Sequence, residues 1–246
     1  MKARARWGVL LLLVMVASLT FGQGAALASP VHSGYDNFQT VAPTQQNFSL
    51  LPIPADFFDP GSEPFQGVIQ FLGEPLGPDS TADTIVARQD TAKTTGRPPV
   101  TVTIPIEIVA LSLVSVNPIT VTYPDLHTEQ WDVKVTLSPT QIPQPTGQMT
   151  VTHLDRSGGT FSSTLPVVPL FTFVRPSDGA VRELDLGLEH LPPIEFGAQD
   201  IPWSHDTPRD ADTKGRFCPG CVNGQPLPFS HQAFIAIHSV ILASKR

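Results

Sequence analysis

Recognisable reactive motifs are missing from this sequence of 246 residues. It has only two cysteines, and it contains neither a Gly-x-Ser-x-Gly elbow nor an Asp-x-Asp-x-Asp-Gly loop. The first pattern marks the nucleophile of many hydrolases, and the second marks EF-hand calcium sites. The case for any function must therefore come from the compartment, the fold and clusters of polar residues.

The N-terminus has the features of a cleaved export signal. Three basic residues precede an apolar segment from Val9 to Leu19, and the small residues Ala26-Leu27-Ala28 suit signal peptidase. The apolar segment is too short for a membrane anchor. We therefore predict that residues 1–28 are removed and that the protein is secreted, periplasmic or otherwise extracellular. No later segment is long and apolar enough to span a membrane, so no membrane span is expected after cleavage.

Positive charge is also scarce. Cleavage after residue 28 removes three of the 15 Lys and Arg residues and none of the 22 Asp and Glu residues, which leaves a formal net charge of −10. An acidic chain without a basic stripe is poorly suited to a phosphate backbone or to an anionic lipid surface. The composition argues against nucleic acid as a partner and leaves an unidentified protein or carbohydrate.

The segment from Pro99 to Tyr123 carries the strongest structural signal, and it indicates β-strands. Apolar and polar residues alternate from Val100 to Ile108, which is the two-residue period of a half-buried strand. Asn117-Pro118 then predicts a turn between two strands. Pro105 has no N–H to donate, so it must lie at a bulge, at a sheet edge or at an unpaired position.

Other segments repeat this pattern. The 26 prolines and 18 glycines disfavour long helices, and turn signals such as Asp178-Gly179 separate short apolar runs. The further expected strands are Val68–Leu72, Thr84–Gln89, Trp131–Leu137, Gln148–Leu154, Thr160–Leu165, Val167–Val174 and Ala180–Leu186. These elements predict an all-β fold, most simply an antiparallel β-sandwich with Greek-key or meander connections.

Three segments lack a clear strand pattern. Ser29–Pro54 is polar and aperiodic, which predicts an extended or disordered leader that packs little. A β-sandwich domain, either single or in two packed halves, is then expected over residues 55–246. Leu188–Gly224 is expected to be loop. Phe229–Ala243 fits both strand and helix spacing, and its β-branched residues favour a terminal strand.

Two stretches resemble a group of exported bacterial proteins that have no assigned activity. They are IPADFFDPGSEPFQGVIQFLGEPLG, from Ile53 to Gly77, and IPIEIVALSLVSVNPITVTY, from Ile104 to Tyr123. The likeness extends over most of the chain after the signal. It implies export and a bacterial source, and it transfers no site residue.

The two cysteines lie close together as Cys218-Pro219-Gly220-Cys221. In an oxidising compartment this spacing predicts a structural disulfide across a tight turn. A redox pair is one alternative, but the sequence after Cys221 would break the helix that such a pair normally uses. A zinc site with His231 and His238 is another, and on a strand the odd separation of these histidines would send them to opposite faces.

Asp200 to Asp212 is the densest polar cluster, with His205, Asp206, Asp210 and Asp212 in one loop. Oxygen ligands of this kind suit calcium, and His205 beside Asp206 suits a hydrolase. The simpler interpretation is a solvated acidic loop whose Asp side chains form turns with their own backbone.

Five aromatic residues fit either a sugar-binding platform or a core, and their exposure would separate the two interpretations. They are Phe57, Phe58, Phe65, Trp131 and Trp203.

The function predicted from these features is an exported structural or interaction module without catalytic activity or cofactor. The alternative is a secreted hydrolase or carbohydrate-binding protein, with calcium as a candidate ligand, that uses the Asp200–Asp212 loop.

Overall fold

Strands make up all the regular secondary structure in the part of the chain that the structure describes. The computed structural model describes residues 28–40, 42–49, 52–93, 96–205, 217–219, 221–222, 225–226 and 234–241, with only the backbone from residue 221 onward. The strands are β1 (Gly34–Thr40), β2 (Thr44–Asn47), β3 (Val68–Gly73), β4 (Thr84–Arg88), β5 (Val100–Leu111), β6 (Leu113–Ser115), β7 (Ile119–Thr122), β8 (Thr128–Leu137), β9 (Gly147–His153), β10 (Gly158–Val167), β11 (Pro169–Val174), β12 (Val181–Asp185), β13 (Ile194–His205), β14 (Phe217–Pro219), β15 (Cys221–Val222), β16 (Gln225–Pro226) and β17 (Phe234–Ile241).

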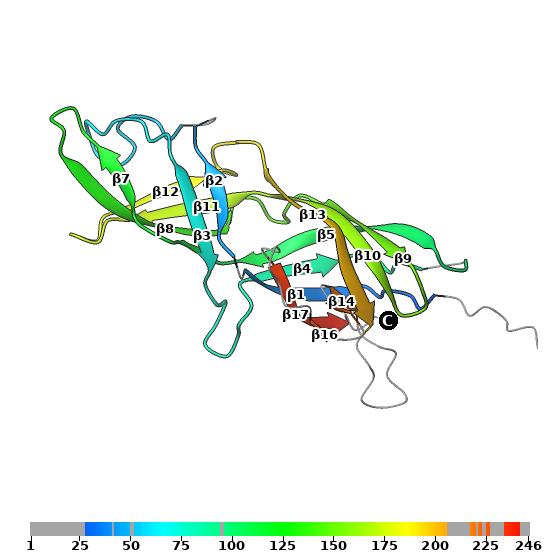
Figure 1. Ribbon diagram of the computed structural model, residues 1–246. Helices are drawn as coiled ribbons and strands as arrows, with labels where there is room; N and C mark the ends of the chain where they lie inside the picture. Colours follow the sequence, from blue (N-terminus) through cyan, green and yellow to red (C-terminus); the bar gives the residue numbers. More distant parts are fainter. Residues whose placement is uncertain are drawn as a thin grey trace, which may run out of the picture.

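These strands form two large antiparallel sheets that pack together, as the sequence predicts. The eight-stranded sheet has the order β14-β13-β10-β9-β5-β4-β1-β17, and it curves so strongly that its end strands β14 and β17 contact each other. The seven-stranded sheet has the order β12-β11-β8-β6-β3-β2, with β7 paired to β8. Figure 1 shows the first sheet toward the right of an elongated molecule and the second toward the left.

The chain passes repeatedly from one sheet to the other. In the eight-stranded sheet, β1 pairs β4, β5 pairs β9 and β10 pairs β13. The strands between each of these pairs in the sequence all belong to the seven-stranded sheet. Neighbours along the chain, such as β9 and β10, pair directly. The fold is therefore an antiparallel sandwich in which hairpins alternate with crossings between the sheets.

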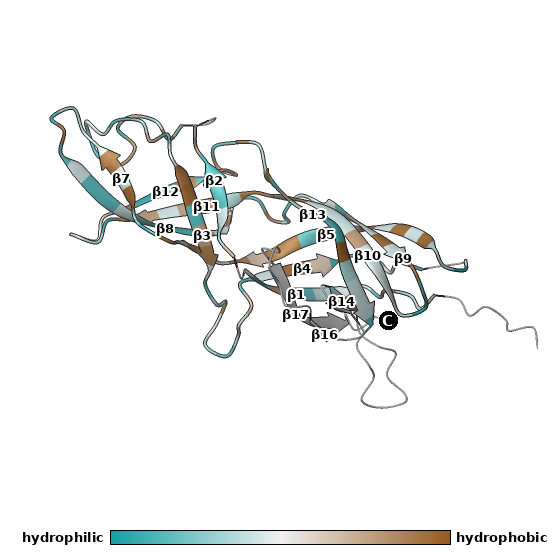
Figure 2. Cartoon of the chain, viewed as in Figure 1, coloured by the Kyte–Doolittle hydropathy of each residue, from teal (hydrophilic) through white to brown (hydrophobic). Residues whose placement is uncertain are grey.

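The alternating segments of the sequence become the strands that carry the core. Along β5, Ile104, Ile106 and Ile108 are buried whereas Thr101 and Thr103 are exposed. One apolar cluster extends across both sheets, and Figure 2 shows how hydrophobic and hydrophilic residues alternate along many strands. The fold thus buries the apolar faces that the two-residue period predicts.

Pro105 lies inside β5 in register with Gln148 of β9, and on its other side it lies just beyond the last paired residue of β4. Its carbonyl accepts a hydrogen bond from Gln89 N at 3.0 Å. Gln89 follows the last residue of β4, so the nitrogen of Pro105 faces the point where the β4 ladder ends. The missing N–H therefore costs the ladder nothing.

The break between β5 and β6 marks one crossing between the sheets. The N–H of Ser112 donates to the carbonyl of Asp83 at 2.8 Å. The Asp83 carboxylate is buried and accepts hydrogen bonds from the Thr40 N–H, the Thr40 hydroxyl and the Thr84 hydroxyl. Asp83 therefore ties the end of β1 and the start of β4 to the crossing, because a buried carboxylate needs such donors.

Two turns use glycine at positive φ, and one of them is the predicted turn at Asp178-Gly179. Gly61 has φ of 90° in the turn that Ser62 N closes onto Asp59 O at 2.9 Å, and Gly179 has φ of 74° between β11 and β12. Only glycine adopts these angles readily. The backbone of Phe234–Ile241 is a strand paired to β1, which confirms the prediction of a terminal strand.

Two predictions about loop-like segments are wrong. Ser29–Pro54 is not a leader that packs little, because β1 and β2 lie within it and both are paired in sheets. A domain boundary at residue 55 would cut through both sheets. Leu188–Gly224 is not all loop, since β13 is a strand of 12 residues. These segments form strands because they pair with neighbouring strands, and their own sequence periodicity does not predict it.

Among the described residues, none forms a helix that is long and apolar enough to cross a membrane. Residues 1–27, which contain most of the predicted signal, lie outside the described residues.

Candidate functional site

The acidic loop is described only as far as His205. His205 ends β13, where its N–H donates to the carbonyl of Ser157 at 2.7 Å. Asp206, Asp210 and Asp212 lie outside the described residues. No group of three or more potential metal ligands occurs among the residues that are described. The calcium and hydrolase interpretations of this loop therefore stay predictions.

The cysteine pair is described for one side chain only. Cys218 lies in β14 opposite Ser204 of β13. The backbone of Cys221 begins β15, whereas its side chain and those of His231 and His238 lie outside the described residues. The disulfide, and the zinc alternative, remain predictions from the sequence.

The five aromatic residues are part of the core and form no exposed platform. Phe58, Trp131 and Trp203 are almost completely buried, and Phe57 and Phe65 are partly buried against the same cluster. Rings such as these contribute packing and edge-to-face contacts; the centroids of Phe58 and Trp131 lie 5.2 Å apart. The sugar-platform interpretation of these residues is wrong.

The richest polar cluster was not anticipated from the sequence, and it centres on Arg175. The Arg175 guanidinium binds both carboxylate oxygens of Asp178, at 2.9 and 2.7 Å. Its Nη1 atom also donates to Asp59 Oδ2 at 2.5 Å and to Glu129 Oε1 at 2.6 Å. Arg182 reaches the other oxygen of Asp59 at 2.6 Å. We call these five residues the Arg175 cluster.

The charges of the Arg175 cluster compensate one another. Burial raises the pKa of Glu129, but hydrogen bonds from Tyr123 and Arg175 outweigh this effect and hold the pKa below its usual value. Burial and the hydrogen bond to Glu129 together raise the pKa of the Tyr123 hydroxyl. A general acid would need a carboxyl whose pKa is raised toward neutrality, whereas Glu129 is held as the anion. The cluster fastens the loop around Asp59 to the ends of β8, β11 and β12.

A second polar group lies inside the eight-stranded sheet. Asp36 and Arg88 form a fully buried ion pair, with Arg88 Nε 2.8 Å from Asp36 Oδ2. His153 is completely buried and makes an edge-to-face contact with Trp203, with centroids 4.8 Å apart. Neither ring nitrogen of His153 has a hydrogen-bond partner in the described part of the structure. Burial, and to a smaller extent the nearby His205, lower the pKa of His153 to about 4.

An apolar groove with a volume of about 510 Å³ lies on the seven-stranded sheet. Residues 46–48 and 52–57 form one wall and residues 183–194 form the other, and the lining includes four prolines together with Phe57, Phe171 and Leu184. We call this hollow the apolar groove. Its volume is in the range of small-molecule and peptide sites, and its lining is mostly apolar, as is usual for them.

All the charged side chains among the described lining residues of the apolar groove are negative. Glu183 and Glu189 line it and are exposed, whereas no Lys or Arg is among its described lining residues. Gln46 is its remaining polar side chain. An occupant that brought positive charge would therefore meet two carboxylates without a competing cation.

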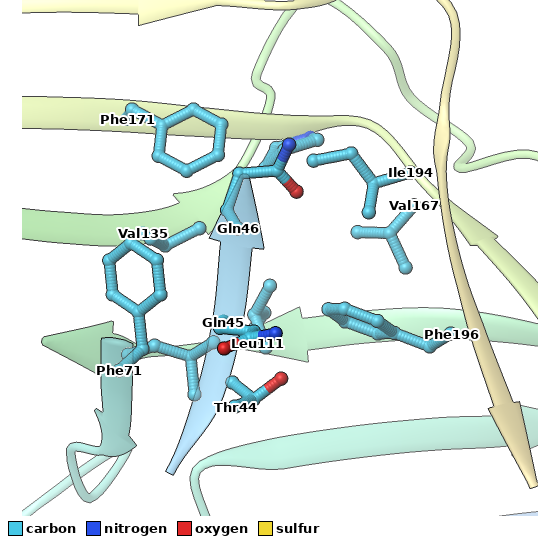
Figure 3. Close-up of a pocket in the computed structure, with 12 residues that line it drawn as sticks. Thr44, Gln45, Gln46, Phe71, Leu111, Val135, Val167, Phe171, Ile194 and Phe196 are labelled. Atoms are coloured by element: carbon cyan, nitrogen blue, oxygen red, sulfur yellow. The ribbon is translucent and has the colours of Figure 1, made fainter. Parts of the chain in front are cut away.

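A second hollow of about 30 Å³, which we call the neck, lies beside the groove. Gln46, Phe171 and Ile194 line both hollows. Figure 3 shows Thr44, Gln45 and Gln46 of β2 on one side of the neck, with Val167, Ile194 and Phe196 across from them. The neck has room for little more than a water molecule.

No local pattern in the sequence points directly to this groove. Its walls come from segments more than a hundred residues apart, and one wall lies in the stretch expected to be a leader. The four prolines of the walls do not distinguish these segments, because the chain contains 26 prolines. The pairing of β2 with β3 places one wall in the sheet, and the packing of Phe48 on Phe171 brings it to the β11 side.

Comparison of the chain with protein-family models, with curated proteins and with solved structures finds no match. The resemblance to exported bacterial proteins stays an expectation from the sequence.

Proposed function

We propose that this protein is an exported, non-catalytic interaction module that binds an extended segment of a partner protein in the apolar groove. The observation that carries the proposal is the groove itself, which combines an apolar, proline-rich lining with Glu183 and Glu189. The segment it suits presents apolar side chains to the lining and basic side chains to the two carboxylates. Export is supported by the predicted signal peptide.

A role in binding fits the polar clusters better than a role in catalysis. Asp59, Glu129 and Asp178 each contact Arg175, so their charges hold the chain together. The carboxylates of the groove are exposed, and exposed carboxylates in water contribute more to partner selection than to affinity. Protein is favoured over carbohydrate as the partner because the aromatic rings that would stack on sugars are largely buried in the core.

The test uses residues 29–246 and two short capped peptides. One alternates valine with lysine, and the other alternates valine with glutamate. We expect the lysine peptide to bind more tightly in a fluorescence anisotropy titration, and we expect the difference to shrink as salt rises. Equal binding of the two peptides, or none by the lysine peptide, would count against the proposal.

Matched variants locate the binding. Changing Glu183→Lys and Glu189→Lys together should reverse the preference between the two peptides. The control changes Asp79→Lys and Asp132→Lys, two exposed acids that do not line the groove. This control alters the net charge equally, so an effect of the same size in both double variants would show that binding reflects overall charge and not the groove.

A further inference from the structure

Part of the outer face of the eight-stranded sheet is polar but carries no charge. Where β5, β9 and β10 lie side by side, their inward residues, such as Ile104, Val151 and Phe161, are buried in the core. Neighbouring residues of a strand point to the opposite face, so the residues between them point outward. We call the following set the hydroxyl face: Thr101, Thr103, Gln148, Thr150, Thr152, Thr160, Ser162 and Thr164. Each of its side chains ends in a hydroxyl or a carboxamide group.

Pairs of hydroxyls order this face across the strands. Thr101 Oγ1 lies 3.1 Å from Thr152 Oγ1, and Thr103 Oγ1 lies 3.0 Å from Thr150 Oγ1. In each pair one hydroxyl donates its proton, so the accepting hydroxyl keeps its own O–H for another acceptor, and the donating hydroxyl keeps lone pairs. Each pair therefore presents both a donor and an acceptor to a ligand.

A hollow of about 540 Å³, which we call the polar hollow, opens where the hydroxyl face meets β13. Its lining residues are Gln148, Thr150, Ser162, Ser163, Thr164, Gly197, Ala198 and Gln199. Gly197 and Ala198 lie opposite Thr164 and Ser163, and their lack of bulk leaves the hollow open. Packing does not require the glycine, because a Cβ at Gly197 would lie 3.7 Å from its nearest neighbour. The volume is in the range of ligand sites.

One hydroxyl of the polar hollow is fixed by the backbone. The register of β10 and β13 shifts between Phe161 and Ser163, and at this irregularity the Asp200 N–H donates to Ser162 Oγ at 3.0 Å. The Ser162 oxygen is thus held as an acceptor, and its own O–H remains available to donate. Bulges of this kind commonly re-aim side chains beside functional sites.

We propose that the polar hollow binds a neutral polysaccharide. A sugar hydroxyl is both donor and acceptor, as are the hydroxyls and carboxamides of the lining. The described lining residues include no charged side chain, so the hollow offers no counter-ion to an anionic or cationic chain, and Ala198 is their one apolar side chain, so a protein segment would bury little there. The polar hollow shares no lining residue with the apolar groove, so it is a second site.

The chemistry of the polar hollow favours a polymer over a single sugar. No aromatic ring is among its described lining residues, so stacking does not contribute. Each hydrogen bond made in contact with water adds little net affinity. A chain that runs from the hollow across the hydroxyl pairs repeats the same contact, and linked contacts raise the affinity without any new kind of interaction.

Affinity electrophoresis tests the proposal with residues 29–246. Native gels contain dextran, mixed-linkage β-glucan or galactomannan, which are neutral, or polygalacturonate as an anionic control, and serum albumin serves as the unretarded reference. We expect at least one neutral polymer to retard the protein and polygalacturonate to leave its mobility unchanged. Failure of all the neutral polymers, or equal retardation by polygalacturonate, would overturn the inference.

Paired variants locate the site. Thr150→Val with Thr164→Val removes two hydroxyls of the polar hollow and keeps the β-branched shape that strands favour. We expect the dissociation constant for the retarding polymer to rise about tenfold. Thr128→Val with Thr136→Val makes the same chemical change at exposed positions of β8, which do not line the hollow, and should have no effect. Equal effects of the two pairs, or no effect of either, would contradict the assignment.

A filling variant tests the hollow from another side. Gly197→Leu places a side chain where the structure has room, so the thermal midpoint should be kept while the dissociation constant rises about tenfold or more. A variant that still binds the polymer like the parent would show that the hollow is not the site.

The same gels separate this inference from the proposed function. The Glu183→Lys, Glu189→Lys variant should be retarded as strongly as the parent, relative to gels without polymer, because the apolar groove is a different site. Loss of retardation in that variant would place the polymer in the groove and overturn the inference. If the valine–lysine peptide binds and no neutral polymer does, the groove-binding function stands and the second site is refuted.

Discussion

His153 should make the protein lose stability as the pH falls from 6.5 toward 4. Its ring is completely buried, and its two nitrogens have no hydrogen-bond partner among the described residues. Burial disfavours the charged imidazolium, and His205 adds to this effect, whereas Asp155 opposes it. The pKa of His153 falls from its ordinary 6.5 to about 4 in the folded protein. The unfolded chain therefore takes up a proton at a pH at which the folded chain does not.

The size of the effect follows from the difference between the two pKa values. The drop from 6.5 to about 4 corresponds to about 3 kcal/mol at 1.36 kcal/mol per pKa unit. Above pH 6.5 both states are neutral and nothing is lost. Between the two values the unfolded state binds more protons, so the free energy of unfolding decreases as the pH falls. Below about pH 4 both states are protonated, and this contribution stays constant.

The assay is urea unfolding of the parent and of His153→Leu at a series of pH values from about 8 to about 4. Any packing cost of the leucine is the same at every pH, so only the change of the difference with pH is compared. We expect the parent to lose about 3 kcal/mol more than the variant over this range. His190→Asn serves as the control, because His190 is exposed and its φ of 54° suits asparagine. Parallel curves for the parent and His153→Leu would refute the argument.

Three further predictions concern groups that hold the fold together. Asp36→Asn should lower the free energy of unfolding by about 3–5 kcal/mol, measured by urea unfolding, because it removes the carboxylate that forms a buried ion pair with the Arg88 guanidinium. Arg175→Lys keeps the charge but cannot hold the Arg175 cluster in the same geometry, and differential scanning calorimetry should show a loss of about 1–2 kcal/mol. Gly159→Ala would press a Cβ against the carbonyl of Thr152 and should lower the midpoint of thermal unfolding, whereas Gly197→Ala has its nearest neighbour 3.7 Å away and should not.

The sequence predicts strands well where one face is buried and the other is solvated. Trp131, Val133 and Val135 of β8 are buried while Asp132 and Lys134 are exposed. The alternation of apolar and polar residues in the sequence therefore matches the buried and exposed faces of the strand. The turn at Asp178-Gly179 was equally readable, because the conformation of Gly179 is a local requirement. Local physics of this kind accounts for most of the predicted all-β fold.

Other parts of the fold carry no local signal. β2 reads TQQN, and Figure 2 shows it as hydrophilic beside the hydrophobic β3. Nothing in these four residues favours a strand, so the pairing with β3 decides their conformation. The Arg175 cluster was hidden for a related reason, since Arg175 and Asp59 are 116 positions apart. Sites assembled by long-range pairing cannot be predicted from the periodicity of one segment.

The distribution of sheet edges connects the fold to the proposed function. A free strand edge invites pairing with other chains, and proteins normally shorten, cover or charge such edges. In the eight-stranded sheet, β14 and β17 approach each other at the two ends. In the seven-stranded sheet, the end strand β2 is only four residues long and entirely polar. These properties protect β2 against indiscriminate pairing, because a short polar edge offers few hydrogen bonds and no apolar side chain of its own. The short polar edge therefore limits aggregation, which leaves the apolar groove as the surface that selects the partner.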